Sequence, residues 1–190
     1  MQPHTKIALY HWNQLIQDAC EYANIELKPE TQGYLLLTLV SYIKNESLAE
    51  KAIALDLRFE SEPSQPNYQQ QLKAQADHSL ILAGLFPAHI ARQSYRISHY
   101  IKLGSDNYQT LSDLMEGNDR IIYRQLAESF VELVDILHII RCFNGSPAMP
   151  LIQAMELWSD TGSKTAYQIL TTNRQSIPLN ESLIDCTYRH

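Results

Sequence analysis

The stretch IARQSYRISHYIKLGSDNYQTLSDLM, residues 90–115, carries the pattern that decides the fold. Its apolar and small residues alternate steps of four and three along the chain, at Ile90, Ser94, Ile97, Ile101, Gly104, Tyr108, Leu111 and Met115. Such a seven-residue repeat keeps one side of an α-helix turned toward a neighbouring helix. The stretch therefore predicts a long helix over residues 88–116 that packs along this seam.

The partner for that seam comes next in the chain, in NDRIIYRQLAESFVELVDILHIIRC, residues 118–142. Helical spacing predicts one long helix over 119–143, with a core face of Ile122, Leu126, Phe130, Leu133, Leu137 and Ile140. The connection between the two helices is short, and a short connection makes helices antiparallel neighbours. We therefore expect an all-α, single-domain helical bundle with a long central antiparallel helix pair.

The rest of the chain also shows helical periodicity and no convincing strand alternation. Two further helices are expected near the N-terminus, over 6–25 and over 27–45, the second with Pro29 in its first turn. A third should run from the Asn45 and Ser47 caps to Leu57, and a fourth over 68–86 with Pro87 as its boundary. Near the C-terminus, a Gly162 stop and a Ser163 cap predict one helix on either side of them. The length of 190 residues fits one domain. We assign that domain to residues 1–172 and predict that the tail, 173–190, packs on the surface.

Gly104 allows two interpretations of the segment KLGSDN, residues 102–107. Glycine could end a helix there, with Ser105 capping the next one, and the charge distribution along the segment favours this break. The seven-residue repeat instead runs through Gly104 without a phase change, which favours a continuous helix with a packing reason for glycine. We favour the continuous helix, in which alanine at 104 would remove the propensity cost of glycine against only a modest contact penalty.

A cationic cluster lies on the outer side of the predicted helix. Arg92, Arg96 and His99 are spaced four and three residues apart, and Tyr95 and Tyr100 flank them. Guanidinium and imidazolium groups on one helix face bind phosphate or carboxylate well. The sequence therefore offers a tentative site for a small anionic ligand at these five residues.

The competing interpretation of the cluster is structural, and we prefer it. The next predicted helix carries Glu128, Glu132 and Asp135 on the face opposite its core residues, so the two charged stripes could pair or could both be solvated. Nucleic acid is an unfavourable partner because the formal net charge is −6.

A metal site is a further tentative hypothesis. Asp135 and His138 stand one helical turn apart, the spacing by which helical bundles present metal ligands, and Asp77 and His78 could contribute from another helix. No Glu-x-x-His motif accompanies them, and Asp135 is expected on the solvent face. The alternative is a surface Asp–His pair.

Composition restricts the class of function. The cysteines Cys20, Cys142 and Cys186 are odd in number and widely spaced, which fits reduced thiols, and the longest apolar stretch, 34–43, is too short to span a bilayer. The N-terminus has no signal-peptide pattern, so we expect a cytoplasmic protein without a membrane partner. Common enzyme motifs such as a Gly-rich phosphate loop are missing, and no cofactor is indicated.

These observations favour a non-catalytic binding or assembly module. Ile121 and Ile139 lie away from the core stripe of the 119–143 helix, so a second copy of the chain could cover them in a homodimer. The alternative is a helical-bundle enzyme or sensor that holds a metal or a small anionic ligand between its helices.

Two segments carry a resemblance to a known group of proteins: GLFPAHIARQSYRISHYIKLGSDNYQTL, residues 84–111, and LWSDTGSKTAYQIL, residues 157–170. Both are similar to segments of conserved, uncharacterised bacterial proteins of about this length. The resemblance covers most of the chain and implies an all-helical fold. It implies no activity and no catalytic residues.

Overall fold

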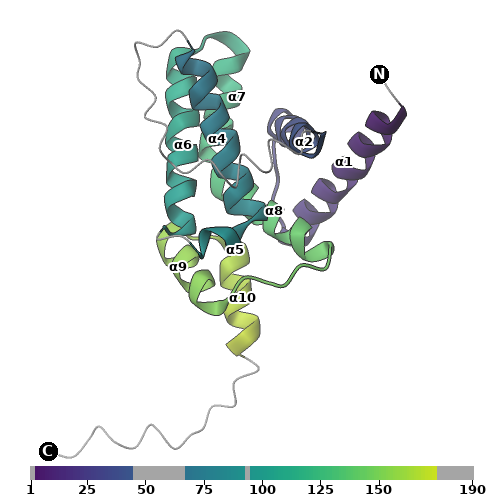
Figure 1. Ribbon diagram of the computed structural model, residues 1–190, viewed down its shortest axis with the longest axis vertical. Coiled ribbons are helices and arrows are strands. Elements are labelled where there is room, and N and C mark those ends of the chain that lie inside the picture. The colour runs from purple at the N-terminus through teal and green to yellow at the C-terminus, as the bar shows by residue number, and fades with distance from the viewer. Residues whose placement is uncertain (1–2, 45–66, 93–94, 175–190) are drawn as a thin grey trace, which may run out of the picture.

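The computed structural model describes residues 3–44, 67–92 and 95–174, and all regular secondary structure in these ranges is helical (Figure 1). The helices are α1 (Pro3–Ala23), α2 (Pro29–Lys44), α4 (Tyr68–Leu85), α5 (Pro87–Ile90), α6 (Ile97–Leu114), α7 (Gly117–Glu128), α8 (Phe130–Phe143), α9 (Leu151–Thr161) and α10 (Lys164–Arg174). The all-α prediction is confirmed. The helix expected from Asn45 to Leu57 lies outside the described residues.

The long helix expected from residue 88 begins later than its repeat indicated. Pro87 opens the short helix α5, which ends at Ile90, and Arg96 has an extended backbone with φ −87° and ψ 157°. Helix α6 therefore starts only at Ile97. Ile90, at the end of α5, and Ile97, at the start of α6, are both buried. Both apolar residues of the repeat therefore lie in the core although they belong to two helices.

Helices α6 and α7 form the expected antiparallel neighbours and pack against one another. Only Met115 and Glu116 connect them, and both have extended backbones. The second predicted helix, 119–143, is divided into α7 and α8 at Ser129. The division is a bend, because Ser129 still donates its backbone N–H to the Gln125 carbonyl and accepts one from Leu133.

Among the described helices α8 is the most deeply buried, and every residue from 133 to 140 is buried. It packs against α1, α4, α6 and α10. Two glycines let its large side chains approach: a Cβ on Gly84 of α4 would lie 2.5 Å from Leu137 Cβ, and one on Gly104 of α6 would overlap the Phe130 ring. The buried apolar residues from α1 to α10 form one cluster around this helix.

Gly104 lies inside α6 and does not have a positive φ. The continuous helix is confirmed there, and the alternative of a left-handed helix end is wrong. The packing reason is the Phe130 ring, with Ser79 of α4 also within contact distance.

The C-terminal helices follow the predicted signals. Gly162 ends α9 with a left-handed backbone, φ 72° and ψ 19°, and the Ser163 hydroxyl accepts the backbone N–H of Ala166 in α10. Helix α10 continues to Arg174, past the predicted start of the tail at 173, and residues 175–190 lie outside the described part of the chain. Within the described ranges, no helix has both the length and the apolar character needed to cross a bilayer.

Candidate functional site

The predicted cationic cluster lies where α5 leads into α6, at the lower end of α6 in Figure 1. Arg92 is exposed in the turn after α5, Arg96 directly precedes α6, and His99 is exposed in its first turn. They do not form the helical stripe that the sequence predicted, because the backbone from Ala91 to Arg96 is not part of a described helix.

Arg96 has acidic partners, and they come from α9. Its Nε lies 3.6 Å from Glu156 Oε1 and its Nη1 lies 3.6 Å from Asp160 Oδ2. Ser98 also donates a hydrogen bond of 2.7 Å to Asp160. The acidic partners expected from the sequence, Glu128, Glu132 and Asp135, lie on α7 and α8, so the expected pairing is wrong and the acids of α9 take their place.

The flanking tyrosines have separate roles. The Tyr95 ring stacks on His99, with centroids 5.0 Å apart and an interplanar angle of 19°, and both side chains are exposed. Tyr100 is a core residue that meets His99 edge to face at 6.2 Å. Tyr95 and His99 are therefore accessible to a ligand, whereas Tyr100 supports them from within.

Two adjoining hollows lie on either side of the Arg96 contacts. The first, about 460 Å³, is called here the Gln153 hollow, and its wall is formed by Ile90, Ala91, Tyr95, Arg96, Ile97, Ser98, Pro150, Ile152, Gln153, Glu156 and Leu157. The second, about 730 Å³, is the His99 hollow, lined by Tyr95, Arg96, Ser98, His99, Ile101, Lys102, Ser105, Asp106, Val131, Asp160 and Thr161. Arg92 borders neither hollow.

The Gln153 hollow combines charges of both signs with an apolar wall. The formal charges of Arg96 and Glu156 cancel. The apolar part of the wall comes from Ile90, Ile97 and Leu157. Gln153 Oε1 is buried and has no hydrogen-bond partner among the residues that the structure describes. That oxygen is not accessible from the hollow, so it is not a contact for a ligand there.

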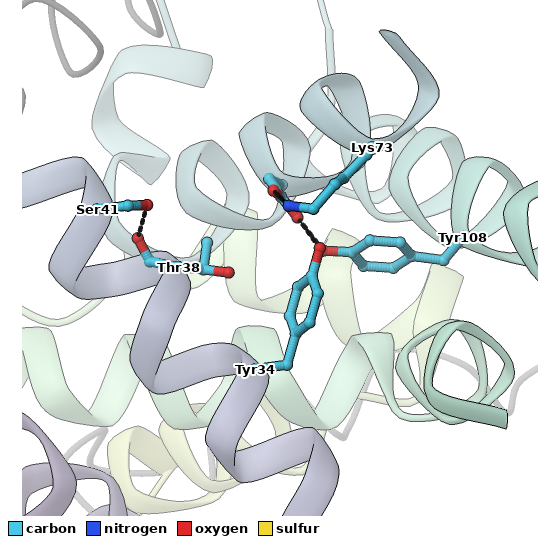
Figure 2. A network of polar contacts seen from close by, with 6 residues as sticks. Tyr34, Thr38, Ser41, Lys73 and Tyr108 are labelled. Atoms are coloured by element: carbon cyan, nitrogen blue, oxygen red, sulfur yellow. Dashed lines mark hydrogen bonds and ion pairs between the residues drawn. The ribbon is translucent and has the colours of Figure 1, made fainter. Parts of the chain in front are cut away.

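Asp77 belongs to a different cluster, in which its carboxylate ties three helices together. The hydroxyls of Tyr34 and Tyr108 each donate to Oδ1 at 2.7 Å, and Lys73 Nζ lies 2.6 Å from Oδ2. Figure 2 shows the two tyrosines and Lys73 converging from different elements. Burial, and then the negative charge of Asp77, raise the pKa values of Tyr34 and Tyr108.

Asp135 is buried and caps the N-terminus of α10. It accepts hydrogen bonds from Ser163 Oγ at 2.5 Å and from the backbone N–H groups of Lys164 at 2.9 Å and Thr165 at 3.4 Å. Burial raises the pKa of this carboxyl, and these hydrogen bonds partly oppose the rise. The expected solvent-facing position of Asp135 is therefore wrong, because α10 covers that side of α8.

His138 lies one turn further along α8 and faces another helix. Its Nε2 donates to the Ala83 carbonyl of α4 at 2.8 Å, and burial lowers its pKa to about 4. At neutral pH the ring is therefore uncharged, and it contributes to the contact between α8 and α4.

The four residues of the metal hypothesis are not brought together. Asp77 is tied to tyrosines and a lysine, Asp135 to α10 and His138 to α4, while His78 is half-buried on α4. Among the residues that the structure describes, no three His, Cys, Asp or Glu side chains lie close enough to share a metal ion.

Sequence reasoning identified Tyr95, Arg96 and His99 but missed Gln153, Glu156 and Asp160. The available signal was the pair of acids four residues apart in a helix that Pro150 begins, opposite in charge to Arg96. Neither the acids nor the arginine indicates from sequence alone that they meet. Comparison of the chain with protein-family models, with curated proteins and with solved structures finds no match.

Proposed function

We propose that this chain is a binding and assembly module that forms a homodimer through α9. The observation that supports the proposal is an exposed apolar stripe along that helix. Leu151, Met155 and Trp158 are spaced four and three residues apart, so they share one face, and they are 44%, 50% and 44% exposed. Apolar side chains gathered on one exposed face are typical of protein-binding surfaces.

Helix α10 widens the stripe. The Tyr167 ring lies 5.6 Å from that of Trp158, and both rings remain partly exposed. Tryptophan and tyrosine are enriched where binding energy concentrates in interfaces. A standard interface buries about 800 Å² on each partner, so the stripe would form its apolar centre and the polar residues of α10 its rim.

Charge favours a second copy as the partner. The stripe has no charged residue, and the acids of α9, Glu156 and Asp160, are held by Arg96 on another side of the helix. A twofold axis near Met155 would pair the two α9 helices in antiparallel fashion and set Leu151 of each copy near Trp158 of the other. Such an arrangement is self-complementary and brings no like charges together.

Neither of the two isoleucines that suggested a dimer from the sequence lies on α9. Ile139 is 3% exposed and packs inside the chain, so it needs no partner. Ile121 on α7 is 54% exposed and marks a competing surface on another helix. The two surfaces lie on different helices, so each can be tested with its own substitution.

Sedimentation equilibrium of the full chain tests the proposal. Wild type should show a concentration-dependent mass between one and two copies. Met155→Glu should be monomeric, because it would place two like charges near the twofold axis. Ile121→Glu is the matched control and should dimerise like wild type; a monomeric wild type, or loss of the dimer only in Ile121→Glu, would contradict the proposal.

We also propose a cytoplasmic location. Cys20 and Cys142, the two cysteines in the described ranges, are free thiols, and free thiols are typical of a reducing compartment. Localisation of a tagged full-length chain by cell fractionation would test this.

A further inference from the structure

We propose that Met155 makes the α9 dimer sensitive to oxidation: hydrogen peroxide converts its thioether to a sulfoxide, and the oxidised chain is a monomer. The proposal rests on the proposed function, because it concerns the regulation of the same exposed stripe on α9. Its support comes from the exposure of Met155, from its place in the stripe and from the chemistry of its sulfur.

Met155 is the most accessible methionine in the described ranges, where Met115 and Met149 are the others. Its side chain is 50% exposed, whereas Met149 is 4% exposed and Met115 is half-buried against the core. An oxidant must reach the sulfur atom to react with it. Peroxide should therefore oxidise Met155 before the other two.

The position of Met155 makes its polarity important for the dimer. Leu151 lies one turn before it and Trp158 one turn after it, and each is 44% exposed. In the proposed antiparallel pair of α9 helices, Met155 of both copies lies near the twofold axis. A change at this residue therefore occurs twice at the apolar centre of one interface.

The reaction consumes one molecule of hydrogen peroxide for each methionine. A lone pair of the Met155 sulfur attacks one peroxide oxygen, the O–O bond breaks, and the other oxygen leaves as water after proton transfer. The thioether loses two electrons and the peroxide gains them. The resulting sulfoxide is a polar group, and burying it in an apolar interface is unfavourable.

Dimerisation should in turn protect the sulfur. Met155 is accessible in the single protomer and would be covered in the dimer, so oxidation proceeds through dissociated protomers. Raising the protein concentration should therefore slow the oxidation of Met155. Met115 lies between α6 and α7, outside the stripe, so its rate should not change.

Sedimentation equilibrium of the full-length chain before and after peroxide treatment tests the proposal, with mass spectrometry locating the added oxygen. Wild type should dimerise before treatment, and its dimer dissociation constant should rise at least about tenfold once Met155 is oxidised. Reduction by methionine sulfoxide reductases should restore the dimer. Met155→Leu keeps an apolar side chain that peroxide does not oxidise, so it should dimerise before and after treatment. Met115→Leu is the matched control and should respond to peroxide as wild type does.

The outcomes separate this proposal from the homodimer itself. A wild-type chain that is monomeric before treatment would overturn both. A dimer whose dissociation constant is unchanged although Met155 is oxidised would overturn the redox sensitivity alone. Loss of the dimer in peroxide-treated Met155→Leu would also overturn it, since another group, such as the exposed thiol of Cys142, would then be responsible.

Discussion

At Gly104 the absence of a side chain is a packing requirement. A Cβ there would overlap the Phe130 ring, which is buried and also packs against Tyr108 at a centroid distance of 5.8 Å. The modest contact penalty expected from the sequence is therefore too small. Gly104→Ala should lower the free energy of unfolding by on the order of 1–3 kcal/mol, and Gly104→Leu by more.

Urea denaturation checks this prediction against a matched glycine. Gly33 lies inside α2, and a Cβ there would meet no atom within 4 Å. Gly33→Ala should therefore stabilise the protein by up to about 1 kcal/mol through helix propensity. If Gly104→Ala were as stable as wild type, the close contact with Phe130 would be refuted.

His138 should make stability depend on pH. Burial lowers its pKa from 6.5 to about 4, so the unfolded chain binds a proton between these values and the folded protein does not. The stabilisation is full above about pH 6.5 and is lost as the pH falls toward 4, by about 3 kcal/mol at most. Burial raises the pKa of Asp135, and this acts with the opposite sign, because the folded protein binds a proton at that carboxyl more readily than the unfolded chain.

Thermal unfolding of wild type and His138→Gln isolates the histidine contribution. Both proteins retain Asp135, so the difference between their pH profiles reports His138 alone. Wild type should lose more stability than His138→Gln between about pH 7 and pH 4.5. Parallel profiles would show that the buried ring does not change its protonation on unfolding.

Tyr34 and Tyr108 should have the reverse effect at alkaline pH. Burial and the Asp77 charge raise both pKa values above the ordinary 10, so these hydroxyls stay protonated in the folded protein. The stabilisation is full below pH 10 and is lost as the pH rises above it. In an alkaline melting series Tyr34→Phe should show a shallower loss of stability than wild type, whereas Tyr10→Phe, altered at an exposed position, should match wild type.

At the scale of elements, α10 depends on a carboxylate from α8. Asp135 accepts from Ser163 and from two backbone N–H groups at the start of α10, where helix N–H groups otherwise lack partners. Asp135→Ala should cost about 1–2 kcal/mol or more and should loosen α10 first.

Hydrogen exchange resolves this effect by element. The α10 amides of Asp135→Ala should exchange faster than those of wild type, with a smaller change in α4 and α6. Glu132→Ala, one turn earlier on α8 and only half-buried, is the control. Unchanged α10 protection in Asp135→Ala would contradict the capping role.

Helix ends with their own chemical signals were predictable from the sequence. Pro29, Pro87 and the Gly162–Ser163 pair each mark an observed boundary, because proline and left-handed glycine act locally. The extended backbone at Arg96 was not predictable, because no proline or glycine stands between Ala91 and Arg96. Because of this extended backbone, Arg92 does not share a helix face with Arg96 and His99.

Over the whole molecule, the sequence could not predict which residues of distant segments would contact one another. Asp135 finds its partners at 163–165, and Arg96 finds its acids sixty residues further on, in α9. Helical periodicity shows which side of a helix is apolar, but not which later helix covers the polar side. The expectation of a surface-facing Asp135 failed for this reason, while the antiparallel pairing of α6 with α7 succeeded because its connection is short.

NMR of the two tryptophan indole N–H signals during dilution tests the proposed homodimer through α9. Trp158 lies on the proposed interface and Trp12 lies half-buried on α1, so one molecule contains both the probe and its reference. We predict that the Trp158 signal shifts with protein concentration while that of Trp12 stays fixed, and that Met155→Glu abolishes the shift. If the protein self-associates but the Trp158 signal does not depend on concentration, the copies do not meet through α9.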